Sequence, residues 1–211
     1  MNPNPSDRDD LGLGDTLKGL RPGLKLFDRY VMQRQLGKGG MGVVWLAEDT
    51  RLEIPVALKF LPDALVHDAA ALDDLRRETR RCMKLSHDHI VRVYDFAEDL
   101  KEDSLAAIAM EYVDGKNLSE LRLEKANRIF EVEEIATWIE QICAALQYAH
   151  ERGKLVHRDL KPANVMITSG GEVKVMDFGI SSSIGDTMTR LTRAQTRGTA
   201  TGGTLPYMSP Q

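Results

Sequence analysis

The chain has 211 residues, with 28 basic and 32 acidic side chains and a formal net charge of -4. Its 42% hydrophobic and 28% charged residues are typical of a folded globular protein of one large or two small domains, and exclude a disordered or collagen-like chain. The balanced charge calls for neither a nucleic acid nor a membrane as partner. The longest apolar run, residues 105–110, is too short to span a bilayer, and the polar N-terminus is unlike a signal peptide, so we expect this segment to be cytoplasmic.

The two cysteines, Cys82 and Cys143, do not form a CxxC pair, so the sequence does not predict a zinc site or a thioredoxin-like motif. Both lie on helical apolar patterns. We therefore expect two buried free thiols in a reducing compartment.

Residues 1–26 are rich in Pro, Asp, Gly and Asn and predict a flexible leader. The part that follows is rich in strand patterns. Strands are expected at 30–36, 43–48, 54–61, 91–96 and 105–112, and a helix at about 68–85.

After residue 114 the pattern becomes helical. Helices are expected at about 117–126 and 132–151, followed by two short strands, 165–168 and 173–176, around the turn 169–171. A strand-rich half and a helix-rich half therefore meet near residues 111–116, and ligands often bind at such a junction.

A glycine-rich stretch, GKGGMGVV, occupies residues 37–44. Glycines at 37, 39 and 42 let backbone amides approach phosphate oxygens closely. A dinucleotide-binding fingerprint requires a helix after the glycines, whereas a strand pattern follows here, and the GK[ST] of a Walker A loop is absent. Two interpretations stay open on this stretch alone: a flexible hairpin over a nucleotide, or an ordinary glycine-rich hairpin.

Lys59 lies in the strand pattern VALK, where a buried ammonium group needs an anionic partner. Glu78, in the following helix, is an available carboxylate. The alternatives are a lysine that reaches solvent from the strand end and a glutamate on a solvated helix face.

Residues 157–164 read HRDLKPAN, and residues 177–179 read DFG. Asp159, Asn164 and Asp177 supply oxygen ligands of the kind that suits Mg²⁺ bound to phosphates. An acid that does not bind the metal can accept the proton of a hydroxyl group.

Together, in this order, these motifs resemble the catalytic domain of a protein Ser/Thr kinase, most closely the bacterial eukaryotic-like branch, over residues 28–211. The resemblance implies an α+β bilobal fold: an antiparallel five-stranded N-lobe with one main helix, and a helical C-lobe that is incomplete here. The implied organisation is a leader at 1–26, an N-lobe at 27–112 and a partial C-lobe at 113–211.

The resemblance assigns the chemistry residue by residue. Asp159 orients the substrate hydroxyl and accepts its proton, Lys161 neutralises the transferring phosphate, and Lys59 holds the phosphates of ATP and pairs with Glu78. Asn164 and Asp177 bind Mg²⁺, or Mn²⁺ in its place. The implied nucleotide-binding residues are Leu36, Gly37, Lys38, Gly39, Gly40, Met41, Gly42, Val43, Val44, Ala57, Lys59, Met110, Glu111, Val113 and Met166.

The resemblance also implies regulation and signal transduction. Arg158 is expected to pair with a phosphorylated threonine, and Thr204 to contact Asp159 and Lys161. The candidate acceptors of autophosphorylation are Thr187, Thr189, Thr192, Thr196, Thr199 and Thr201, the last three being the better candidates. The implied regulatory spine consists of Cys82, Val93, His157 and Phe178.

The expected partners are proteins with Ser or Thr hydroxyls, including a second copy of this chain, and neither nucleic acid nor membrane. A parent chain with a downstream membrane anchor is compatible with this. Gln211 stands where the family has a glutamate, and the helices that normally follow are missing, so we expect the isolated chain to be marginally stable and poorly active. The alternative function is a non-catalytic ATP-binding or scaffold module; a small-molecule kinase fits the motifs less well.

Overall fold

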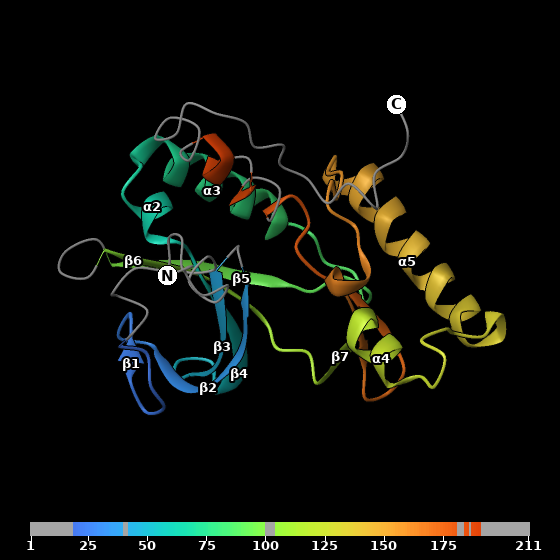
Figure 1. Cartoon of the computed structure of the whole chain (residues 1–211). Coiled ribbons are helices and arrows are strands. Elements are labelled where there is room, and N and C mark those ends of the chain that lie inside the picture. Colours follow the sequence, from blue (N-terminus) through green and yellow to red (C-terminus); the bar gives the residue numbers. More distant parts are fainter. Residues whose placement is uncertain (1–18, 40–41, 100–103, 181–183, 186, 191–211) are drawn as a thin grey trace, which may run out of the picture.

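The computed structural model describes residues 19–39, 42–99, 104–180, 184–185 and 187–190. A large sheet with α3 beside it forms the first half, and a small sheet with α4 and α5 forms the second (Figure 1). The strand-rich and helix-rich halves expected from the sequence are therefore confirmed.

The large sheet is antiparallel and has six strands in the order β1-β2-β3-β4-β6-β5. The strands are β1 (Lys25–Leu26), β2 (Tyr30–Gly39), β3 (Gly42–Asp49), β4 (Ile54–Phe60), β5 (Val93–Asp99) and β6 (Leu105–Glu111). The sheet has one strand more than the five that were expected. This extra strand, β1, lies in the segment expected to be a leader and pairs with β2; two residues are too few to show a periodic pattern.

Alternation along the strands gives the sheet two different faces. In β4, Val56, Leu58 and Phe60 join the hydrophobic cluster that covers one face. Ala57 belongs to the second cluster, on the face towards α3, and Lys59 follows two residues later with only 6% of its surface exposed. The period of two thus brings Lys59 to the α3 face.

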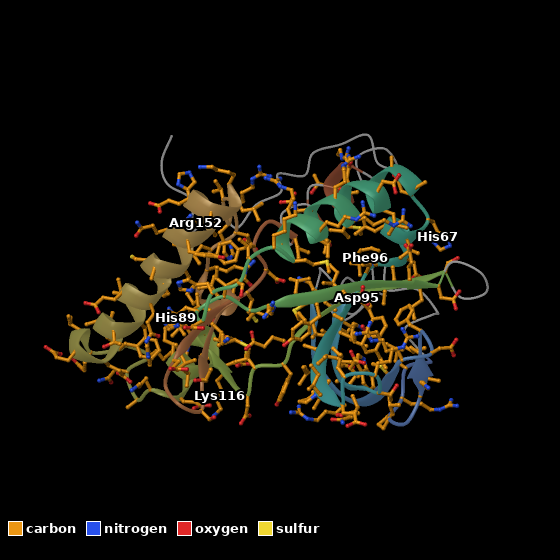
Figure 2. All side chains as sticks on the ribbon, turned by 180° about the vertical axis from the view of Figure 1, so that it is seen from behind. His67, His89, Asp95, Phe96, Lys116 and Arg152 are labelled. Atoms are coloured by element: carbon orange, nitrogen blue, oxygen red, sulfur yellow. The ribbon has the colours of Figure 1, made fainter. Side chains whose placement is uncertain are left out.

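Two helices follow β4: α2 (Asp63–Val66) and α3 (Ala69–Cys82). The Asp68 side chain caps α3 by accepting a hydrogen bond from Ala71 N at 3.0 Å. Figure 2 shows Asp95 and Phe96 on opposite sides of β5, with Phe96 towards α3. Phe96 packs against the cluster that contains the buried residues of α3, so this helix covers one face of the sheet.

The second half contains a three-stranded sheet in the order β7-β8-β9. Its elements are β7 (Gly115–Asn117), α4 (Leu118–Glu124), α5 (Val132–Gly153), the 3₁₀ turn η2 (Pro162–Asn164), β8 (Val165–Thr168) and β9 (Val173–Val175). The expected helices α4 and α5 and the expected hairpin of β8 and β9 are confirmed.

Backbone hydrogen bonds join the two halves away from the chain connection. Val91 N donates to Val175 O, and Val175 N donates to His89 O, each at 2.9 Å. Ile90 and Val175 form a parallel bridge. Val175 is the last residue of β9 and lies two residues before Asp177. These hydrogen bonds therefore hold the backbone that leads into the DFG segment against the strand-rich half.

Two expectations concern single features. Cys82 is buried as expected, but Cys143 is exposed, because its position on α5 turns away from the core. Within the described ranges, no helix has the length and hydropathy needed to span a membrane.

Candidate functional site

A cavity of about 320 Å³ lies where the two halves meet. Ten of the residues expected to bind the nucleotide or the metal line it: Leu36, Gly37, Val44, Ala57, Lys59, Met110, Glu111, Val113, Met166 and Asp177. They come from β2, β3, β4, β6 and β8 and from the segments after β6 and β9, so the fold gathers residues far apart in the sequence.

The remaining residues expected to bind the nucleotide are not among the described residues that line this cavity. Gly40 and Met41 are outside the described residues. Val43 is buried in the cluster on the opposite face of the sheet, because it alternates with Val44. Lys38 and Gly42 lie in the hairpin of β2 and β3, where Gly39 pairs with Gly42, and neither Lys38 nor Gly42 is among the described residues that line the cavity.

Tyr112, between Glu111 and Val113, lines the cavity as well. The cavity also has lining residues that the motifs did not indicate: Arg34, Val91, Gly115, Asn117, Glu120 and Met176. Asn117 and Glu120 form a capping box at the start of α4, where Asn117 N donates to Glu120 Oε2 at 2.9 Å and Glu120 N donates to Asn117 Oδ1 at 3.0 Å. The sequence pattern N-x-x-E predicts the cap of this helix. It does not indicate that Asn117 and Glu120 line a cavity.

The buried Lys59 has an anionic partner, as predicted, but the partner is Asp177. The Lys59 Nζ to Asp177 Oδ2 distance is 2.8 Å. Glu78 pairs instead with Arg81, at 3.1 Å between Glu78 Oε2 and Arg81 Nη1. The expected Lys59–Glu78 ion pair is not among those formed by the described residues.

Asp159, Lys161 and Asn164 are held together in the HRDLKPAN segment. Asp159 Oδ2 accepts a hydrogen bond from Lys161 Nζ at 2.8 Å and another from Asn164 Nδ2 at 3.2 Å. Asn164 Nδ2 also donates to the Asp159 carbonyl at 2.8 Å, and Asn164 is buried in η2. The Asp159 carboxylate is therefore fixed in orientation by two side-chain donors.

The backbone around these residues adopts a conformation that is uncommon for side chains other than glycine. Arg158 has φ 65° and Asp177 has φ 61°. Such outliers persist only where the surrounding structure enforces them, and they concentrate at functional sites.

The four residues expected to form the regulatory spine meet in the structure. The rings of His157 and Phe178 are 4.7 Å apart, and Cys82 Sγ donates to Phe178 O at 3.0 Å. Val93 lines one small cavity together with Cys82 and Phe178. Burial, with Glu78 adding a smaller effect, raises the pKa of Cys82 to about 12. Cys82 is therefore a packing residue rather than a reactive thiol.

His157 is anchored from two sides. Its Nε2 lies 2.7 Å from Met176 O, and Asp159 N donates to its Nδ1 at 3.3 Å. Burial lowers the pKa of His157, against the opposing effects of the Met176 carbonyl and the Asp177 and Asp159 charges. With Asp159 N donating to Nδ1, a neutral His157 carries its proton on Nε2. The ring thereby links the HRD segment to the DFG segment.

Comparison with known proteins agrees with this geometry. The protein kinase domain model matches residues 30–211. A probable serine/threonine-protein kinase of Streptomyces coelicolor is 44% identical over 188 residues, 89% of this chain and 27% of the relative. The serine/threonine-protein kinase PknB of Mycobacterium tuberculosis is 40% identical over 191 residues, 88% of this chain and 29% of the relative. The chain belongs to the protein kinase domain family.

Solved structures show the same relationship. The crystal structure of the Mycobacterium tuberculosis PknI kinase domain aligns with a TM-score of 0.67 and 36% identity, over 77% of this chain and 64% of that one. The chain thus spans a little over a quarter of the curated relatives that it matches, and about two thirds of the kinase domain of that structure.

Protein kinases use ATP and a divalent metal, and the donor set here suits both. The cavity has an apolar part, between Val44 and Ala57 on the sheet side and Met166 on β8, that can hold a flat base. Lys59 and Asp177 line the same cavity and supply a cation for phosphate and a carboxylate for a metal.

Proposed function

We propose that the chain is the catalytic part of a protein Ser/Thr kinase that transfers the γ-phosphoryl group of Mg²⁺-bound ATP to Ser or Thr hydroxyls. The observation that carries this proposal is the fixed cluster of Asp159, Lys161 and Asn164, near a cavity with Lys59 and Asp177 among its lining residues. The relatives carry the name serine/threonine-protein kinase, which supports the choice of acceptor.

Some of these residues bind the phosphates and the metal, and Asp159 accepts the proton of the acceptor hydroxyl. Lys59 binds phosphate oxygens, while Asn164 and Asp177 hold the divalent ion, which neutralises phosphate charge when bound. Asp159 orients the acceptor hydroxyl and takes its proton, because its carboxylate is already held by two donors. Lys161, 2.8 Å from that carboxylate, offers a positive charge to the transferring group.

The apolar lining serves nucleotide selection. Met110 stands at the gatekeeper position, and Glu111 and Val113 follow it in the segment that offers backbone groups to adenine.

The alternative, a non-catalytic ATP-binding or scaffold module, is not favoured, because the residues proposed for catalysis lie together rather than apart.

The direct test is incubation of the chain with Mg²⁺ and ATP, followed by intact mass measurement. We expect phosphate on the parent chain and none on the Asp159→Asn variant, which keeps an acceptor oxygen for Lys161 and Asn164. Parallel samples with Mn²⁺ and with a chelator identify the metal. Equal phosphate gain in parent and variant, or nucleotide binding without any gain in the parent, would refute catalysis by this site.

We also propose autophosphorylation in the segment after DFG. Thr187 is buried and its Oγ1 accepts from Arg190 Nη2 at 3.1 Å, while Thr189 Oγ1 donates to Gly185 O at 2.8 Å. These contacts favour other acceptors, and Thr192, Thr196, Thr199 and Thr201 lie outside the described residues, as does Thr204. Peptide mapping of active protein should find phosphate at 192–201; its absence from that range would contradict this proposal.

A further inference from the structure

Arg34 on β2 is linked to Tyr112, which follows the end of β6. Arg34 Nη2 donates a hydrogen bond to Tyr112 Oη at 3.2 Å. Both residues line the cavity in which the nucleotide is proposed to bind. In the large sheet, β2 and β6 are not neighbours, because β3 and β4 lie between them. The hydrogen bond therefore joins two parts of the cavity wall that the sheet itself holds apart.

The direction of Arg34 depends on an irregularity in β2. Met32 pairs with Ala47 of β3. Arg34, two residues later, pairs with Leu46, so the register shifts by one residue at Gln33, as in a β-bulge. In a regular strand, Arg34 would share a face with Met32, which is buried in the cluster on the other side of the sheet. The register shift turns Arg34 to the cavity face instead.

A row of paired residues leads across the sheet from Arg34 towards Tyr112. In order, the row consists of Arg34, Leu46, Ala57 and Met110. Residues that are directly paired share one face of a sheet, and Tyr112 follows Met110 by two residues. Ala57 and Met110 line the cavity. The hydrogen bond therefore closes a ring around the wall of the cavity that β3 and β4 form.

The part of β2 that carries Arg34 lies at an edge of the sheet. The chain around β1 pairs with β2 only as far as Met32. From Arg34 onwards, β3 is the one strand paired with β2 among the described residues. An edge with a single neighbour has fewer contacts to hold it than an inner strand has. A link from Arg34 to Tyr112 therefore restrains the strand that carries Leu36 and Gly37, which also line the cavity.

We propose that Arg34 and Tyr112 form a positioning pair that holds the edge of the sheet over the bound nucleotide and slows its release. This inference rests on the proposed function, because it requires the cavity to bind a nucleotide. Arg34 is exposed, so its hydrogen bond competes with water and contributes only a modest factor. The pair controls how long the nucleotide stays bound and takes no part in phosphoryl transfer.

The test measures the release of ADP, which has no γ-phosphoryl group and is not consumed. The parent chain is loaded with Mg²⁺ and fluorescently labelled ADP, and stopped-flow fluorescence follows dissociation after addition of excess unlabelled ADP. We expect Tyr112→Phe, which keeps the ring and removes the hydroxyl acceptor, to raise the dissociation rate about two- to fivefold. Arg34→Met, which keeps an apolar stem and removes the donors, should raise it by a similar factor. Calorimetry with unlabelled ADP should show affinity weakened by the same factor.

A double variant and a matched control separate this contact from other effects. If the hydrogen bond is the cause, Arg34→Met adds little once Tyr112→Phe is present. Gln33→Met is the control: Gln33 is the exposed neighbour of Arg34, and its Nε2 donates to Glu48 Oε2 of β3 at 3.4 Å. Gln33 is not among the described residues that line the cavity, so this change should leave release unaltered. Urea unfolding of each variant checks that the fold is retained.

Three results would overturn the inference: an unchanged dissociation rate in Tyr112→Phe or Arg34→Met, an equal increase in Gln33→Met, or additive effects in the double variant. Failure of the proposed function gives a different result. If the parent binds ADP but transfers no phosphate from ATP, catalysis is refuted and the release rates still decide the role of Arg34. If the parent binds no ADP, both proposals fail together.

Discussion

Gly42 is required by the packing of the sheet as well as by any phosphate that the glycine-rich loop covers. Its φ of 121° lies in the region that favours glycine, and a Cβ there would collide with the backbone carbonyl of Phe60. A backbone atom inside a sheet cannot move aside cheaply. The third glycine of the motif is therefore fixed by structure even without a ligand.

We expect Gly42→Ala to lower the free energy of unfolding by about 3 kcal/mol, because strain and collision add. Gly171→Ala is the matched control: Gly171 has φ 86° but nothing within 4 Å of the added Cβ. It should lose only about 1 kcal/mol, the cost of the left-handed backbone. Urea unfolding measures both, and equal losses would show that the Phe60 carbonyl yields.

Thr79 is a second residue whose environment gives a clear expectation. It is fully buried in α3, and its Oγ1 has no hydrogen-bond partner among the described residues. An unsatisfied buried hydroxyl costs free energy that an apolar group of the same shape avoids. Thr79→Val should raise the free energy of unfolding by about 1 kcal/mol.

The control for Thr79 is Thr79→Ser, which keeps the hydroxyl and removes the methyl group. It should destabilise the chain, since it loses apolar contact without relieving the unsatisfied oxygen. A loss of stability in Thr79→Val would mean that the hydroxyl is hydrogen-bonded in solution.

At the scale of elements, α3 is important because it carries Glu78 and Arg81 and covers the face of the sheet that holds Lys59. Asp68 caps its N-terminus at 3.0 Å from Ala71 N. Asp68→Ala should cost about 1 kcal/mol of stability. Asp74→Ala, on the exposed side of the same helix, should change stability by less than about 0.5 kcal/mol.

Thermal or urea unfolding distinguishes the two aspartates. If Asp74→Ala costs as much as Asp68→Ala, the loss reflects the charge of the helix rather than the cap. The cap also bears on the site, because a frayed first turn would loosen the helix that presents Glu78.

The long elements were predictable because their patterns repeat. The apolar period of α3 and α5 and the nearly continuous apolar runs of β3 and β4 appear directly in the sequence. The helical and strand periods of the backbone then decide which face each residue takes. Three short elements, β1, α2 and β7, were not predicted, because they contain too few residues to show a period and, unlike β8 and β9, they do not flank a recognised hairpin turn. Their positions depend on pairing with distant strands, such as β7 with β8.

At the scale of the whole molecule, the motifs predicted which residues gather but not how they pair. Lys59, Asp177 and Met166 line one cavity, as the order of motifs indicated. Glu78 pairs with Arg81, three residues later on the same helix, and that spacing is readable in the sequence. Lys59 pairs with Asp177, 118 residues away, and this pair depends on tertiary packing that no local pattern encodes.

Protonation of His157 makes the stability of this packing depend on pH. It lies between the HRD and DFG segments, where burial lowers its pKa below the ordinary value of 6.5. The folded chain therefore binds this proton less readily than the unfolded chain. The contribution to stability is complete above about pH 6.5 and is lost as the pH falls through the lowered pKa of the folded state.

We expect the free energy of unfolding of the parent chain to decrease between about pH 7 and pH 5, as His157 and the similarly shifted His87 take up protons on unfolding. His157→Phe retains a ring against Phe178 but removes the titrating group. It should be less stable at neutral pH, having lost the contact with Met176 O. Its stability should also depend less on pH in this window, and His87→Gln should reduce that dependence further. Urea unfolding across the window measures both slopes, and an unchanged slope in His157→Phe would assign the dependence to other groups.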